Sequence, residues 1–434
     1  MTHRPALRLT ELQLLVAPSL LAIVGLLTIF LVPRGTTAWS WTDLGISLGF
    51  VAALLLMHIG FAVVGFRGDQ VLLPITATLS CLGLLMIQRL QPDLTDLNPG
   101  YHGLAQKQLI YLGSGFAVLW CTAALFHGLQ WVRRYKYTWL IVSLVLLAAT
   151  MIFGTEINGA RLWLSIGPFQ AQPSELAKVT LVTFMAGYLE DYQDLVGSSW
   201  RLGPLRLPPF PYLVPMGVMW AGSLLILVAQ NDLGAALLFF GIFLSMLYIA
   251  SGRLVYVTLG FVSFALGSWF AYHLFSRIGV RVENWLNPWQ HPLTSGWQQV
   301  QSDYALATGG LFGTGLGRGQ PWRIPEVQTD FVFSAMGEEL GLFGTLAVLA
   351  LYLLLVMRGF AIGLRASDGF ARLVAVGLST ALAIQTLIII GGVSRLIPLT
   401  GITLPFVSYG GSSLLTNFLI VGLLLHISSL PRRL

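Results

Sequence analysis

The chain has 434 residues, of which 56% are hydrophobic and only 10% charged, and its mean hydropathy is +0.77. Soluble domains carry about 25% charged residues, so this composition excludes a soluble globular protein and indicates an integral membrane protein. The formal net charge is +6. In a membrane protein such an excess reflects the orientation of the loops more often than nucleic-acid binding.

Apolar stretches of membrane-spanning length recur along the whole chain. A bilayer core of roughly 30 Å needs about 20 apolar residues per helix. In chain order the predicted spans are residues 12–32, 45–66, 70–90, 108–126, 137–154, 176–192, 212–229, 233–250, 254–276, 331–357, 371–391 and 409–428. No small-residue cleavage site follows the first span, which is therefore predicted to be retained. The sequence predicts an all-α polytopic membrane bundle of about 12 transmembrane helices.

The basic residues between the spans favour an orientation with both termini in the cytoplasm. Most of the remaining arginines gather in two outer segments, Thr155–Leu176 and Arg277–Thr329. These outer cations are candidates for holding an anionic group, and the alternative is that they are ordinary solvated loop arginines.

The outer segment 277–329 is far longer than the other connections, and loops of this length are usually functional or disordered. Its six large aromatic residues supply enough apolar area for folding, so disorder is not expected. Its glycine run, GGLFGTGLGRG, permits tight turns or a close approach to a ligand. The sequence therefore predicts a large, folded extracytoplasmic loop.

Ionisable groups at membrane depth are costly and mark candidate functional sites. Glu175 and Lys178 are three residues apart at a helix start that begins with Pro173, so they can pair on one face. A capped helix with an internal ion pair is the structural alternative. Asp232 lies in a tight connection between two apolar runs, where a plain turn aspartate is the alternative.

Two further candidate groups lie nearer the C-terminus. Helical spacing relates Asp330 to Glu338 and turns Glu339 away, so Asp330 and Glu338 are the more plausible inward-facing pair, with separate interhelical hydrogen bonds as the alternative. The stretch Pro398–Ser413 contains helix-breaking prolines and glycines before the last span. Such backbone is tolerated at depth only when protein or a wet cavity surrounds it, and its freed amides suit a phosphate. A kinked helix entry is the alternative.

Five blocks of residues together resemble the SEDS family (shape, elongation, division and sporulation) of bacterial cell-wall synthesis, the RodA, FtsW and SpoVE proteins. The blocks are Gly159–Arg161 with Trp163, Gln172–Glu175 with Lys178, Asp232–Gly234, Thr329–Phe331 with Gly337–Gly341, and Pro398–Ser413. The resemblance implies a ten-helix core over residues 70–434. Residues 1–69 then form an N-terminal two-helix extension.

The resemblance implies peptidoglycan glycosyltransferase activity, an enzyme function in cell-shape or cell-division wall synthesis. Such proteins polymerise lipid II, an undecaprenyl-pyrophosphate-linked disaccharide pentapeptide, at the outer face of the bacterial cytoplasmic membrane. Their usual partner is a class B penicillin-binding protein, a transpeptidase. A divalent cation, magnesium or manganese, is the one cofactor that this chemistry leaves room for, its ligands unknown, and no nucleic acid is expected.

The resemblance also assigns site residues. The family places an essential aspartate before a proline in the large outer loop, and here that position is His291, followed in register by Pro292, Gly296, Trp297 and Gln298. Imidazole can serve as a base near neutral pH, but it is a poor ligand for magnesium. The implied catalytic residues are His291, Asp330 and Glu338; the implied substrate-binding residues are Arg161, Trp163, Glu175, Lys178, Asp232, Gln298, Ser408, Tyr409, Gly410, Gly411, Ser412 and Ser413.

Three positions depart from the family pattern, namely Leu162, Asn231 and Gln328. Together with His291 they keep two alternatives open. One is a catalytically degenerate paralogue that binds a lipid-linked precursor or a transpeptidase partner. The other is a transporter of lipid-linked precursor, which polar groups at depth also suit.

Overall fold

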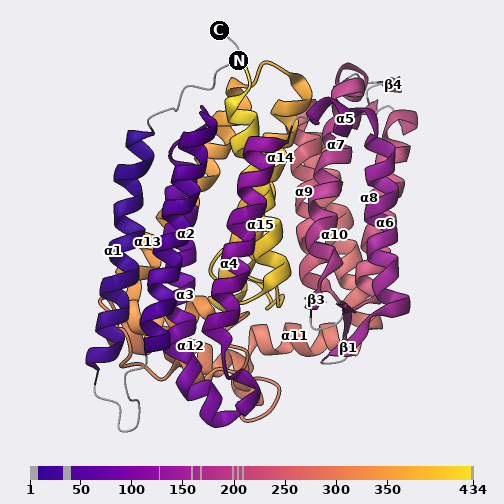
Figure 1. The fold of residues 1–434 in the computed structure, drawn as a ribbon. Helices are drawn as coiled ribbons and strands as arrows, with labels where there is room; N and C mark the ends of the chain where they lie inside the picture. The colour runs from indigo at the N-terminus through magenta and orange to yellow at the C-terminus, as the bar shows by residue number, and fades with distance from the viewer. Residues whose placement is uncertain are drawn as a thin grey trace. The chain divides into compact units, whose positions relative to one another are not determined.

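The protein is a helical bundle in the computed structural model, which describes residues 8–32, 41–126, 128–157, 160–166, 169–197, 200–202, 205–207 and 210–431 (Figure 1). The α-helices are α1 (Leu9–Leu31), α2 (Trp41–Val64), α3 (Leu72–Leu97), α4 (Leu104–Trp120), α5 (Leu129–Arg134), α6 (Lys136–Phe153), α7 (Pro173–Gly197), α8 (Phe210–Ala229), α9 (Leu233–Ser251), α10 (Leu254–Leu274), α11 (Ser276–Leu286), α12 (Trp297–Gly309), α13 (Val332–Arg365), α14 (Gly369–Val393) and α15 (Gly411–Ser429). Short turns are η1 (Pro99–Tyr101), the π-helical η2 (Cys121–Leu125), η3 (Pro288–Gln290) and η4 (Pro321–Arg323).

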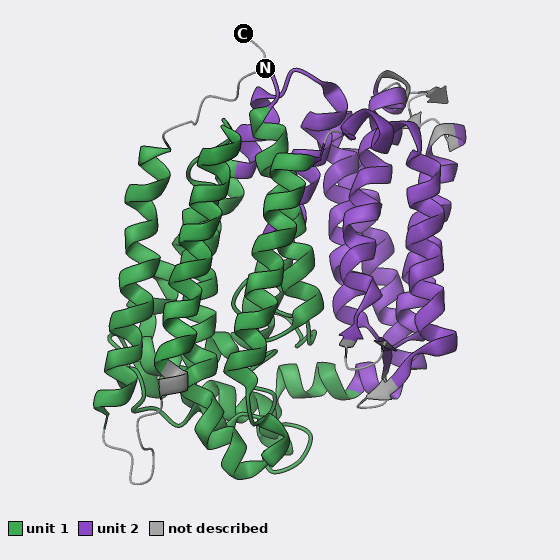
Figure 2. Ribbon diagram, in the orientation of Figure 1, with its two compact units in different colours: residues 1–125, 280–358, 385–429 green, residues 126–279, 359–384, 430–434 purple. Residues whose placement is uncertain are grey.

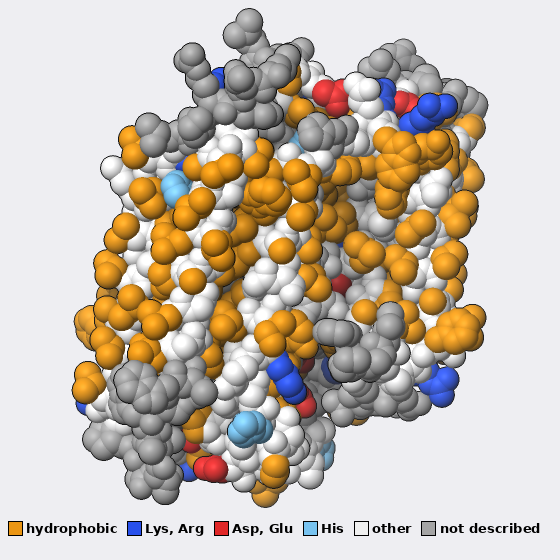
Figure 3. Space-filling view, in the orientation of Figure 1, with side chains coloured by type: hydrophobic (Ala, Val, Ile, Leu, Met, Phe, Trp, Pro, Cys, Tyr) orange, Lys and Arg blue, Asp and Glu red, His pale blue; other side chains and the backbone are white. Residues whose placement is uncertain are grey.

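The predicted polytopic membrane bundle is confirmed. Each predicted span coincides with a long helix, and ten of the helices in the described residues are long and apolar enough to cross a membrane. The two others are α7, which carries charged residues near both ends, and α8, whose described apolar part, Leu213–Ala229, is shorter. On the face shown in Figure 3, hydrophobic side chains cover the middle of the helices, and most charged side chains lie toward their ends.

The chain forms two compact units, whose boundaries fall after η2, within α11, α13 and α14, and after α15 (Figure 2). Unit 1 contains residues 1–125, 280–358 and 385–429, and unit 2 contains residues 126–279, 359–384 and 430–434. In unit 1, α15 packs against α4, and α1 and α2 pack against α3 and α4. Close approach of α4 to α15 depends on Gly115, where an added Cβ would lie 2.2 Å from the Phe418 ring.

Unit 2 is built around α7, which packs against α6 and α9, while α8 packs against both α6 and α9. Small antiparallel sheets join its helices. The first contains β1 (Thr155–Ile157), β2 (Ala160–Ile166) and β3 (Phe169–Ala171), in which Thr155 pairs with Trp163 and Leu164 with Ala171. The second contains β4 (Trp200–Leu202) and β5 (Leu205–Leu207).

Candidate active site

The long segment, residues 277–329, is folded, as its aromatic content predicted, and from Val280 onward it belongs to unit 1. It supplies most of α11 and all of η3, α12 and η4. The turn between η3 and α12 is tight, because the carbonyl oxygen of His291 accepts hydrogen bonds from the backbone N–H groups of Thr294 (3.2 Å) and Gly296 (3.0 Å). A Cβ at Gly296 would lie 2.2 Å from the Pro288 carbonyl oxygen, so only glycine fits there. The turn therefore has a defined shape.

His291 stands at the surface of this turn. Its side chain is exposed, and its ring makes no hydrogen bond to any residue that the structure describes. The turn is held to α11 by Asn284, whose Nδ2 donates to the Ser295 carbonyl oxygen at 2.8 Å. The imidazole is thus presented to solvent on a braced backbone.

Of the two carboxylates nearest to His291 in sequence, one has a hydrogen-bond partner and the other has none among the described residues. Asp303 accepts a hydrogen bond from Arg395 at 2.9 Å, and Arg395 also donates to the carbonyl oxygen of Trp285. Glu283 is exposed and has no side-chain partner among the described residues. Through Arg395, Asp303 of α12 thus connects the stretch before Pro398 to α11 and α12.

Gln298 is the second residue of α12. Its Nε2 donates to the Pro325 carbonyl oxygen at 3.1 Å, which ties the start of α12 to the chain that follows η4. Gln298 is therefore engaged in bracing the long segment.

Asp330 precedes α13, which begins at Val332, so the prediction that helical spacing relates Asp330 to Glu338 is wrong. Instead, Asp330 lies beside the Pro398–Ser413 stretch, where a Cβ added at Gly401 would be 3.5 Å from its Oδ2 atom. Next to it, the N–H of Tyr409 donates to the Gln328 carbonyl oxygen at 2.8 Å, and the Ser408 hydroxyl donates to that of Thr329. Two predicted blocks about 80 residues apart in the chain thus form one structure.

The Pro398–Ser413 stretch is non-helical up to Gly410, and its middle part, Leu404–Ser408, is buried in protein, the setting that broken backbone requires. Its carbonyl groups find partners, because Gln385 Nε2 donates to the Thr403 oxygen at 2.9 Å and the Tyr352 hydroxyl donates to the Pro405 oxygen. Ser413, at the start of α15, receives a hydrogen bond from the Thr403 hydroxyl at 2.7 Å. Its hydroxyl is therefore already used to hold this stretch.

The other predicted residues of this stretch, Tyr409, Gly410, Gly411 and Ser412, are partly exposed around the start of α15. Tyr409 lies against Tyr111 of α4, with 6.0 Å between ring centroids. A role in binding an anionic substrate group stays a prediction for these four residues and for Ser408 and Ser413.

Glu338 and Glu339 both contact the glycine run of the long segment. Glu338 Oε1 accepts a hydrogen bond from the Gln320 backbone N–H at 2.6 Å. Glu339 forms a buried ion pair with Arg89 of α3, with 2.7 Å between Nε and Oε1, and Arg89 also donates to the Gly319 carbonyl oxygen at 2.8 Å. Arg89 is not among the predicted site residues, although an arginine inside the predicted span 70–90 is itself a signal of function.

Unit 2 holds the remaining predicted site residues. Lys178 and Glu175 pair at 2.6 Å near the start of α7, as their spacing predicted. Asp232 caps α9 by accepting a hydrogen bond from the Ala235 N–H at 2.9 Å. Arg161 is exposed and Trp163 half-buried on β2. The candidate site residues are thus divided between unit 1 and unit 2.

Metal ligands do not gather in either unit: the described residues contain no group of three or more His, Cys, Asp or Glu side chains that could hold an ion. In many enzymes magnesium is bound through one or two carboxylates together with substrate phosphates. The described carboxylates could hold a magnesium ion only in this way.

Comparison with known proteins connects this geometry to a family. The FtsW–RodA–SpoVE family model, described as a cell cycle protein, matches residues 70–432. The peptidoglycan glycosyltransferase RodA of Mycobacterium tuberculosis (strain ATCC 25618 / H37Rv) is 37% identical over 433 residues, covering 99% of this chain and 92% of the relative. The stage V sporulation protein E of Bacillus subtilis is 36% identical over 376 residues, or 84% of this chain and 98% of the relative.

Two solved structures share the fold. A chain from a structure titled as a peptidoglycan synthase complex that coordinates polymerisation and crosslinking aligns with a TM-score of 0.67 and 28% identity, covering 83% of this chain and 98% of that chain. The rod shape determining protein RodA of Thermus thermophilus aligns with a TM-score of 0.60 and 27% identity, covering 83% and 97%.

Proposed function

Because this chain belongs to the FtsW–RodA–SpoVE family, we propose that it is a peptidoglycan glycosyltransferase, which joins lipid-linked disaccharides into glycan strands. The observation that carries this conclusion is the match along 99% of the chain to a relative named for that activity. The substrate that fits is lipid II. The apolar helix faces suit its prenyl tail, and the exposed Arg318, which forms no ion pair with the described residues, suits its pyrophosphate.

The reaction needs a base. A sugar hydroxyl attacks an anomeric carbon, a new C–O bond forms, the bond to the pyrophosphate oxygen breaks, and the hydroxyl proton must be accepted. His291 offers an exposed ring on a fixed turn, and a neutral imidazole accepts a proton through its unprotonated nitrogen. We assign His291 as this base. Asp330, beside Gly401, and Glu338, which accepts a hydrogen bond from the Gln320 N–H, are assigned as positioning residues of unit 1.

A divalent cation, magnesium or manganese, would bind together with the pyrophosphate of the substrate. When bound it would neutralise charge on the departing pyrophosphate. Because the described residues contain no group of three or more His, Cys, Asp or Glu side chains, the phosphates of the substrate would supply most of its ligands. Loss of activity on chelation, restored by magnesium or manganese, would support this role.

The setting of the reaction follows from the same family membership. The protein is a multi-pass membrane protein. We propose the bacterial cytoplasmic membrane, with both termini inside and the long segment at the outer face. Because one structural neighbour is titled as a complex that polymerises and crosslinks, we also propose a class B penicillin-binding protein as its partner.

The test uses the full-length protein in detergent, with and without a cognate class B transpeptidase, and labelled lipid II. We expect glycan strands from the wild type and a loss of at least about 100-fold with His291→Ala, the usual contribution of a general base. His102→Ala is the matched control, because His102 is also an exposed histidine of unit 1.

Other outcomes would change the proposal in defined ways. A silent wild type that becomes active with His291→Asp would show a degenerate paralogue. Strands of equal yield from the wild type and His291→Ala would remove His291 from the mechanism. Lipid translocation in vesicles without any polymer would indicate the transporter.

A further inference from the structure

Arg395 has a backbone conformation that usually belongs to glycine. At the end of α14 the Leu396 N–H donates to the Gly391 carbonyl oxygen at 2.8 Å, and the Arg395 N–H donates to that of Gly392 at 3.3 Å, which is the bonding of a Schellman motif. The left-handed residue of this motif is here Arg395, with a φ of 58°. Such strain persists only where the surroundings fix the residue, and it clusters at functional sites.

The guanidinium of Arg395 caps a second helix, α11. Its Nη2 donates to the carbonyl oxygens of Trp285 (3.2 Å) and Leu286 (3.4 Å), the last two residues of α11. The final carbonyl groups of a helix have no partner within the helix, and a cation beside them also interacts favourably with the helix dipole. Arg395 thus supplies a C-terminal cap to α11 from 110 positions away in the chain.

Other groups hold Arg395 in this orientation. The Trp285 Nε1 donates to the Arg395 carbonyl oxygen at 3.0 Å, so the contact with α11 is made in both directions. The Arg395 Nη1 donates to Asp303 of α12 at 2.9 Å. The Gln299 Nε2 donates to the same carboxylate at 3.3 Å and to the Val393 carbonyl oxygen at 3.2 Å. The side chain is therefore fixed by residues of α11 and α12 together.

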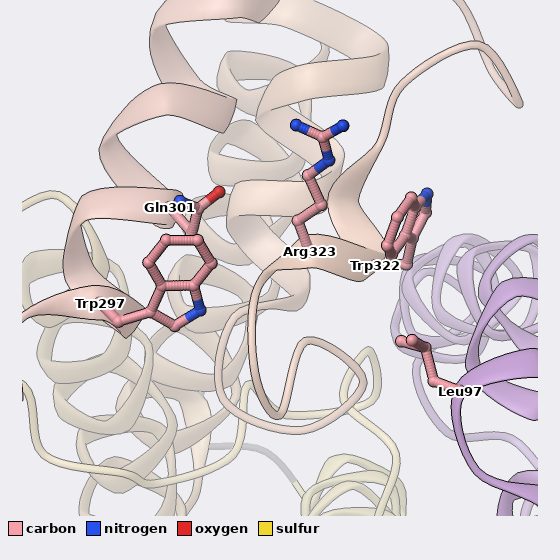
Figure 4. Close-up of a pocket in the computed structure, with 5 residues that line it drawn as sticks. All are labelled: Leu97, Trp297, Gln301, Trp322 and Arg323. Carbon is pink, nitrogen blue, oxygen red and sulfur yellow. The ribbon is translucent and has the colours of Figure 1, made fainter. Parts of the chain in front are cut away.

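The face of α12 that binds Arg395 is opposite to its pocket-lining face. Gln299 and Asp303 are four residues apart and share one face, whereas Trp297 and Gln301 share the other. Figure 4 shows Trp297 and Gln301 side by side where they line a pocket. A substitution at Arg395 therefore removes a contact of α12 without changing any residue that lines this pocket.

The end of α11 leads directly into the turn that carries His291. After Leu286 only Asn287 and the short turn η3 precede His291. The last turn of α11 also contacts the far side of the His291 turn, because Asn284 Nδ2 donates to the Ser295 carbonyl oxygen at 2.8 Å and the Ser295 hydroxyl donates to Asn284 Oδ1 at 3.2 Å. The position of this helix end thus sets the position of the His291 backbone.

We propose that Arg395 is a positioning residue for His291. By capping α11 and pairing with Asp303, its guanidinium holds the last turn of α11, and through it the turn that presents the imidazole. This inference rests on the proposed role of His291 as the base of glycosyl transfer. A displacement of about 1 Å at a reacting group can cost about 100-fold in rate, so a cap remote from the substrate affects turnover.

Two substitutions separate the guanidinium from the backbone strain. Arg395→Gly removes the guanidinium and relieves the positive φ, whereas Arg395→Ala removes the guanidinium and keeps the strain. In strand synthesis from lipid II by the full-length protein with its transpeptidase, we expect both to lower kcat equally, by about 10-fold to 100-fold, with KM changed by less than about twofold. If Arg395 only stabilised the fold, Arg395→Ala would be clearly the less active variant, and the proposal would be wrong.

A double-mutant cycle tests whether Arg395 acts through His291. Once the imidazole is absent, its position no longer matters, so Arg395→Gly should change kcat by less than about twofold in the His291→Ala background. A further loss as large as in the wild-type background would overturn the proposal. Arg365→Gly is the matched control, because it makes the same substitution at an exposed arginine, the last residue of α13, and should leave kcat unchanged.

Amide hydrogen exchange tests the positioning without any turnover. We expect Arg395→Gly to speed exchange over residues 287–297 and to leave exchange in α3 unchanged, because only the contacts of the His291 turn are loosened. This local change in a wild type that makes no strands would support the role of Arg395 and contradict the glycosyltransferase function. Unchanged exchange in this turn, or equally faster exchange in α3, would overturn the positioning role, even in a protein that makes strands.

Discussion

His291 differs from the other ionisable candidates because its side chain is not already engaged. Lys178 pairs with Glu175, Arg89 with Glu339, and Arg395 with Asp303. A charged group held in such a pair is poorly placed to exchange a proton, and removing one partner of a buried pair is destabilising. The unbonded ring of His291 therefore makes it the candidate base that the structure favours most.

The Glu175–Lys178 pair is expected to contribute to the stability of the protein. The Lys178 side chain is 1% exposed, so Lys178→Met should leave the Glu175 carboxylate buried beside a neutral side chain and lower the free energy of unfolding by about 3–5 kcal/mol. The double variant Glu175→Gln, Lys178→Met should recover most of this loss, because it removes both charges. Unfolding midpoints of the purified proteins in mild detergent measure both effects.

A double variant as unstable as Lys178→Met would show that Lys178 stabilises the protein through packing of its aliphatic stem and not through its charge. Lys107→Met is the control, because it changes an exposed lysine by the same substitution.

The ion pairs also show which residue contacts can be predicted from the sequence alone. Glu175 and Lys178 are three apart on one helix, so their contact followed from spacing. Arg89 and Glu339 are 250 positions apart, and their contact depends on how α3 and α13 pack. Local helix geometry predicts a pair within one helix, but it does not predict a pair between two helices.

At the scale of elements, α13 is interrupted at Gly341, whose φ is 69°. The interruption leaves backbone groups without helical partners, and the glycine run of the long segment supplies them. The Glu338 and Glu339 carbonyl oxygens accept hydrogen bonds from the N–H groups of Thr314 (2.9 Å) and Gly315 (3.1 Å). The Leu342 N–H donates to the Gly310 carbonyl oxygen at 2.9 Å. The glycine run is thus a structural partner of α13.

Gly341→Ala should destabilise the protein through this contact. A Cβ at Gly341 would lie 2.2 Å from the Gly313 nitrogen, in addition to the backbone strain of a positive φ. We expect a loss of about 1–3 kcal/mol from crowding, on top of the strain. Thermal unfolding measures the total.

Gly252→Ala isolates the strain, because Gly252 has a φ of 67° and nothing lies within 4 Å of its added Cβ. Equal destabilisation by the two substitutions would show that the contact between the glycine run and α13 contributes nothing.

At the scale of the whole molecule, a buried arginine ties the start of the predicted N-terminal extension to its end. Arg8 donates to the carbonyl oxygens of Phe66 (3.0 Å) and Asp69 (3.0 Å) and pairs with Glu11. Asp69 in turn pairs with Arg358 of α13 at 2.6 Å. The division at residue 69 stays a prediction, and α1 and α2 are packed as part of unit 1.

Arg8→Met should loosen α1. The substitution leaves the fully buried Glu11 carboxylate with only His58, 2.9 Å away, as an ionic partner among the described residues. We expect faster amide hydrogen exchange across Leu9–Leu31, because local opening of that helix becomes easier. Arg67→Met, which changes an exposed arginine near the end of α2, should leave exchange unchanged. Unaltered exchange in Arg8→Met would show that apolar packing alone holds α1.

The sequence by itself determined that this is an apolar, multi-helical membrane protein and where its helices lie, because hydropathy and helical periodicity are local properties. It also placed the long segment and the motifs that identify the family. Only the tertiary structure decided that Asp330 lies beside Gly401 and that Arg89 pairs with Glu339. These contacts join residues far apart in the chain, and the packing of helices and broken backbone that creates them is encoded in no single segment.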